Sequence, residues 1–122
     1  MIEKLKEKVL LNIKKALIEE IKNMDIENEN KDVLDEIRNE FYEKFSKEFT
    51  NVFSEFINNS LEDIAESLSN AIISVILKTP DEQSQEDEAE KTVRKGYLLA
   101  LLSIVEDELN KIRGWKKLFG TR

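Results

Sequence analysis

The sequence predicts an all-α protein, a compact four-helix bundle with a central C-terminal helix and a short tail rich in basic and aromatic residues. Three glycines and one proline among 122 residues are too few for the many turns of a β-sandwich. Apolar residues make up 40% of the chain and recur at helical spacing. A chain of this length forms one domain and can bury a single core without disulfides or metals.

The first predicted helix covers residues 2–24, whose apolar positions form one continuous stripe. Leu11 and Ile18 fall outside that stripe and lie seven residues apart, so they stack on a second face of the helix. Two exposed aliphatic side chains need no function. A pair at heptad spacing is also suited to contact with another subunit, and we predict that Leu11 and Ile18 bind a partner.

The second predicted helix covers residues 32–57, with Asp32 as its N-cap. Five phenylalanines lie within it at steps of three or four residues, which places them on one side of the helix. They are expected to form the spine of the core; a cavity for an apolar ligand is the alternative. Apolar positions also recur at eleven residues, which predicts a helix that is nearly straight or coils weakly in the right-handed sense. The five are Phe41, Phe45, Phe49, Phe53 and Phe56.

The third predicted helix covers residues 61–78 and ends before Pro80. Its apolar stripe is rotated by roughly a third of a turn from the phenylalanine stripe, at about 100° per residue. A kink or reversal near Asn59 removes this mismatch, because Asn58, Asn59 and Ser60 are poor helix formers. One continuous helix with a winding apolar face is the alternative.

The last predicted helix covers about residues 82–113 and is apolar over more than half of its circumference, so we expect it to be central. Gly96 within it costs about 1 kcal/mol relative to alanine, which indicates that another backbone passes close by. Gly114 is expected to stop the helix and leave a tail at 114–122.

The segment from Lys111 to Arg122 contains five bases and no acid, with aromatic residues interleaved. It can pack on the core, bind an acidic partner such as residues 81–90 of a neighbouring subunit, stack on single-stranded nucleic acid, or sit at a membrane surface. We predict six partner-binding residues here: Lys111, Arg113, Trp115, Lys116, Lys117 and Phe119.

The chain contains no histidine and no cysteine, which excludes Ser–His and Cys–His nucleophile pairs and the usual zinc ligand sets. Three glycines cannot build a phosphate-binding loop or a dinucleotide fingerprint. Glu62, Asp63 and Glu66 resemble the magnesium clusters of all-α nucleotide pyrophosphohydrolases. They lie opposite the apolar stripe of their helix, however, and are expected to face solvent. We predict no enzyme activity, no catalytic residue, no cofactor and no metal.

Residues 1–15 mix charges into the apolar positions, unlike a secretory signal. The longest apolar run, 97–105, is broken only by Ser103 and is far shorter than the ~20 residues that span a membrane. A soluble cytoplasmic protein is therefore expected. The net charge of −7 disfavours nucleic-acid binding by the whole surface.

These observations predict a non-catalytic helical protein–protein interaction or assembly subunit that self-associates as a homo-oligomer. The alternative is an accessory nucleic-acid-binding protein that uses the basic aromatic tail.

Overall fold

The computed structural model describes residues 2–24, 26–27, 29–58, 65–77 and 87–119. These residues contain no strands, which confirms the all-α prediction, and form four helices: α1 (Ile2–Lys22), α2 (Lys31–Asn58), α3 (Ala65–Ile76) and α4 (Glu88–Phe119). No helix among them has an apolar stretch long enough to cross a lipid bilayer.

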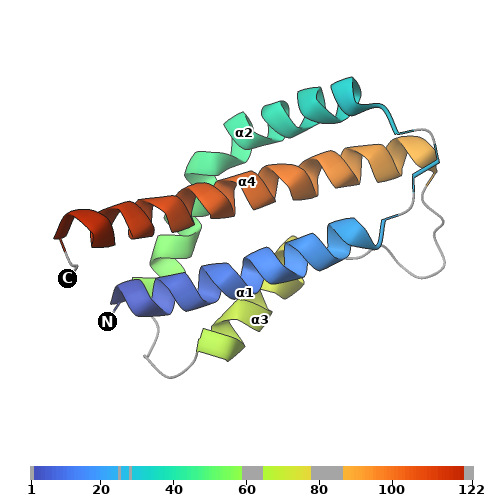
Figure 1. Ribbon diagram of the computed structural model, residues 1–122. Coiled ribbons are helices and arrows are strands. Elements are labelled where there is room, and N and C mark those ends of the chain that lie inside the picture. Colours follow the sequence, from blue (N-terminus) through green and yellow to red (C-terminus); the bar gives the residue numbers. More distant parts are fainter. Residues whose placement is uncertain (1, 25, 28, 59–64, 78–86, 120–122) are drawn as a thin grey trace.

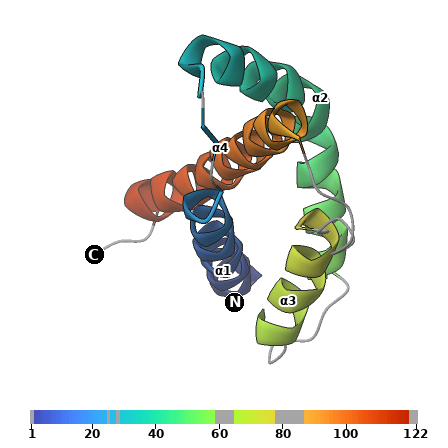
Figure 2. The same ribbon diagram turned by 90° about the vertical axis from the view of Figure 1, so that its right-hand side faces the viewer.

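Helix α4 lies between α1 and α2, as expected for a helix that is apolar over more than half of its circumference (Figure 1). Helix α3 packs against α1, and Figure 2 shows the two helices side by side. All four helices contribute side chains to one core, so the chain is a helical bundle. The buried core residues are Leu5, Val9, Leu10, Ile13, Leu17, Phe53, Ile57, Leu68, Ile72, Leu98, Leu101, Val105, Leu109 and Ile112.

The phenylalanine stripe of α2 is only partly the spine that its spacing predicts. Phe53 is 2% exposed, but Phe56 is 44% exposed and its neighbour Ile57 is buried in its place. Steps of four residues advance about 40° around a helix, so a stripe built from such steps winds around α2. Ile57 continues this winding and Phe56 does not. The prediction of Phe56 as a core residue is therefore wrong.

Helix α2 also bends in its second half, where a helix that is nearly straight or coils weakly in the right-handed sense was expected (Figures 1 and 2). Thr50 Oγ1 donates a hydrogen bond to the Ser46 carbonyl oxygen at 2.9 Å, a back-bond that often accompanies helix bending. In the first half, the Phe41 and Phe45 rings meet the Tyr97 ring of α4 edge-on, with centroids 5.4 and 6.1 Å away. The first half of α2 thus packs on α4 through aromatic rings.

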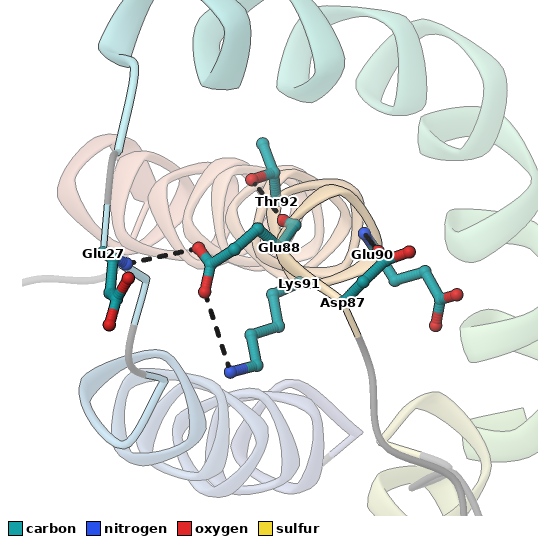
Figure 3. Close-up of polar contacts among 6 residues, drawn as sticks. All are labelled: Glu27, Asp87, Glu88, Glu90, Lys91 and Thr92. Atoms are coloured by element: carbon teal, nitrogen blue, oxygen red, sulfur yellow. Dashed lines mark hydrogen bonds and ion pairs between the residues drawn. The ribbon is translucent and has the colours of Figure 1, made fainter.

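The N-cap of α2 and the start of α4 differ from those expected. The Asn30 side-chain oxygen accepts hydrogen bonds from the amides of Asp32 and Val33 at 3.0 and 3.3 Å, so Asn30 caps α2 in place of Asp32. The Asp87 carboxylate accepts from the Glu90 amide at 2.8 Å (Figure 3). Asp87 is therefore the N-cap of α4, which begins at Glu88 and not near residue 82.

The prediction that the last helix stops at Gly114 is also wrong, because α4 continues through this glycine to Phe119. Among the described residues no glycine has the positive φ that a glycine helix stop uses. The segment predicted as a tail is thus helical up to Phe119.

Helices α2 and α3 are separate and run in opposite directions, in agreement with the expected reversal (Figures 1 and 2). The residues proposed to form that break, 59–64, lie outside the described residues.

Polar contacts join the start of α4 to α1 and to the connection between α1 and α2. Arg94 pairs with Glu20 of α1 at 2.9 Å, and Lys95 pairs with Glu29. Glu88 accepts a hydrogen bond from the Glu27 amide at 3.2 Å (Figure 3). These contacts position the first reversal of the chain beside the N-terminus of α4.

Candidate interaction surface

The outer face of α1 carries the two partner-binding residues predicted for this helix. Leu11 and Ile18 are each 41% exposed. Leu10, Ile13 and Leu17 belong to the stripe that faces the core, and these three side chains are fully buried. The outer face is therefore available for contact with another molecule.

Four lysines lie on the same face, and all four are exposed. Lys8, Lys15 and Lys22 are seven residues apart, and Lys4 continues the seven-residue spacing of the two aliphatic residues. Two interleaved heptad series thus follow one face of α1. The lysines are absent from the predicted partner-binding residues, although their spacing is visible in the sequence. We call this surface the α1 seam: Lys4, Lys8, Leu11, Lys15, Ile18 and Lys22.

Two of the basic residues predicted at the C-terminal end are described by the structure with their side chains, and both belong to α4. Lys111 and Arg113 are exposed. Lys111 Nζ donates to the Glu108 carboxylate at 2.8 Å, and this hydrogen bond raises the pKa of Lys111. The predicted binding residue Lys111 is therefore already engaged within α4.

The backbone of the remaining predicted residues, Trp115, Lys116, Lys117 and Phe119, belongs to α4. Their side chains lie outside what the structure describes, so the contact of Trp115 with the core or with a partner stays a prediction. This end of α4 and the start of α1 lie at the same end of the molecule (Figure 1).

A groove of about 720 Å³, lined mainly by polar and charged residues, runs between α2 and α4. Tyr42 donates a hydrogen bond to the Asp107 carboxylate, and this contact raises the pKa of Tyr42. The Glu108 side chain is only 10% exposed and pairs with Lys111. The hydrogen bond between Tyr42 and Asp107 crosses the groove and joins α2 to α4. The pair of Glu108 and Lys111 lies within α4.

Two smaller hollows flank the helices. A mostly apolar one of about 450 Å³ lies between α2 and α4 beside Phe41 and Tyr97. Another of about 470 Å³ lies between α1 and α3 and includes the seam residues Lys8 and Lys15. In the described part of the chain, no three acidic side chains gather into a possible metal site. Glu66 is exposed, and Glu62 and Asp63 lie outside the described residues.

Comparisons with protein-family models, with curated proteins and with solved structures find no match to this chain.

Proposed function

We propose that this chain is a non-catalytic helical interaction subunit that self-associates, and that the α1 seam is its contact surface. The exposure of Leu11 and Ile18 at heptad spacing carries this proposal. The core contacts of α1 come from a different stripe, so the fold does not need these two side chains. A face with this spacing is suited to packing against another helix.

The lysines of the seam favour a partner whose surface is acidic. Their aliphatic stems extend the apolar contact, and their ammonium groups need negative charge opposite them. Each copy of this chain carries a net charge of −7, so a second copy supplies such a surface.

Sedimentation velocity between about 1 µM and about 1 mM tests this proposal. We expect the average mass of the wild-type chain to rise with concentration, and the double variant L11S/I18S to stay monomeric. The matched control is V75S, because Val75 is 71% exposed on α3 and its replacement should leave association unchanged. A wild-type chain that stays monomeric throughout would overturn the proposal.

Nucleic-acid binding by the C-terminal end of α4 is the second candidate. The exposed Arg113 supports it, whereas the engagement of Lys111 by Glu108 weakens it. A monomeric chain that binds an oligonucleotide at low salt, and loses this binding in K116E/K117E and at high salt, would favour this candidate.

A further inference from the structure

The α1 seam is poorly suited to packing against the α1 seam of a second copy. Two such faces oppose like charges in either direction: in parallel, Lys8, Lys15 and Lys22 meet their own counterparts, and in the antiparallel register that pairs Leu11 with Ile18, Lys15 meets Lys14. Like charges directly opposite one another at an interface oppose association. A contact surface on the second copy that lies elsewhere and carries acidic residues avoids this repulsion.

The second half of α2 has an exposed face of the required chemistry. Val52 and Phe56 are 45% and 44% exposed and lie one turn apart. Glu48 and Glu55 are exposed beside them, and Lys44 lies one turn before Glu48. This face combines an apolar centre with two carboxylates, as the seam combines an apolar centre with ammonium groups. We call it the α2 acidic face: Lys44, Glu48, Val52, Glu55 and Phe56.

The spacings of the two surfaces match when the helices run antiparallel. With Leu11 opposite Val52, the four-residue step to Lys15 on α1 matches the four-residue step back to Glu48 on α2. The three-residue step from Leu11 back to Lys8 likewise matches the step forward from Val52 to Glu55.

The same register places a further opposite-charge pair in contact range, Glu19 of α1 with Lys44 of α2, both exposed. A parallel arrangement that keeps both lysine–glutamate pairs instead places Leu11 opposite the polar Asn51. The antiparallel register is therefore the better match of both charge and apolar contact.

We propose that the α1 seam of one copy packs antiparallel on the α2 acidic face of the next, with Lys8 opposite Glu55, Leu11 opposite Val52 and Lys15 opposite Glu48. This inference rests on the proposed self-association and specifies its geometry. Within one chain, α1 and the second half of α2 pack toward the same core, so their outer faces point away from each other. The contact is thus head-to-tail, and repeated use of it builds a ring or an open chain of copies.

Charge reversal on each surface tests the inference. We expect K8E/K15E and E48K/E55K each to weaken self-association at least about tenfold in sedimentation velocity, because each opposes like charges. An equimolar mixture of the two variants should regain wild-type association, and so should the chain that carries all four substitutions. All four positions are exposed, and circular dichroism checks that each variant stays folded.

The outcomes separate this inference from the broader proposal. Wild-type association that E48K/E55K leaves unchanged would overturn the head-to-tail geometry while keeping self-association. A monomeric wild-type chain would overturn both. Loss of association in both variants without recovery in the mixture would also contradict the lysine–glutamate pairing.

Thiol crosslinking tests the register, since the natural chain contains no cysteine. A mixture of L11C and V52C chains should crosslink with a short bismaleimide, whereas L11C alone should not. Crosslinking of L11C with itself would show a symmetric α1 contact, and preferential crosslinking of L11C to N51C would show the parallel register. Either result would overturn the antiparallel contact.

Discussion

At the scale of single residues, Gly96 shows how closely α4 approaches α2. A Cβ placed on Gly96 would lie 2.3 Å from Ile37 Cγ2 and 2.8 Å from Ile37 Cβ. A contact with the Cβ of a β-branched residue cannot be relieved by turning its side chain. A Cβ placed on Gly114, in the same helix, would meet no atom within 4 Å. A side chain therefore has no room at Gly96, whereas the space at Gly114 is open.

Replacing Gly96 with alanine should destabilise the fold by about 1–2 kcal/mol, because the steric overlap outweighs the higher helix propensity of alanine. Replacing Gly114 with alanine is the matched control and should stabilise the chain by about 0.5–1 kcal/mol. Urea denaturation measures both changes. A G96A variant as stable as the wild-type chain would show that α2 can move away from α4.

At the scale of one helix, α2 buries its aromatic residues unevenly. The Phe53 ring stacks on Phe49, with ring centroids 5.9 Å apart, inside the core shared with α1. The next phenylalanine, Phe56, points outward. Spacing alone groups these residues on one stripe, whereas the winding and bending of α2 separate them.

The variants F53A and F56A test this difference on one helix. F53A should lose about 3–5 kcal/mol of unfolding free energy, because it leaves a cavity in the core. F56A should change the unfolding free energy by less than about 1 kcal/mol when the chain is monomeric. Equal losses in chemical denaturation of the two variants would contradict the placement of Phe56 at the surface.

At the scale of the whole molecule, three ionisable side chains make the free energy of unfolding depend on pH in the alkaline range. The Asp107 carboxylate raises the pKa of Tyr42, burial raises the pKa of Tyr97, and Glu108 raises the pKa of Lys111. Each group therefore binds its proton more tightly in the folded chain than in the unfolded chain. Their contribution is fully present below the pKa of the unfolded chain, about 10, and is lost as the pH rises through the folded values.

Unfolding free energy should therefore fall above about pH 10. The two tyrosines can be followed separately by the absorbance of tyrosinate in Y42F and Y97F, because each variant keeps one tyrosine. In each variant, the pKa of the one remaining tyrosine should lie above the ordinary value of 10.0. An ordinary midpoint for Tyr42 in Y97F would show that its bond to Asp107 does not persist in solution.

The periodic sequence by itself determined the fold class, the four helices and the central place of the last one, because apolar spacing sets which face of each helix must be buried. It also identified Leu11 and Ile18, which fall outside that spacing. Short polar side chains compete to cap a helix within one or two residues of each other, so Asn30 could replace Asp32 without a change in pattern.

Only the tertiary structure decided which members of an apolar stripe reach the core, because this depends on how each helix bends and on which neighbour it meets. It exposed Phe56, buried Ile57 and carried α4 through Gly114 to Phe119. It also showed which lysines of α1 remain at the surface, which spacing alone cannot reveal. Together with Leu11 and Ile18, these exposed lysines form one continuous candidate interface.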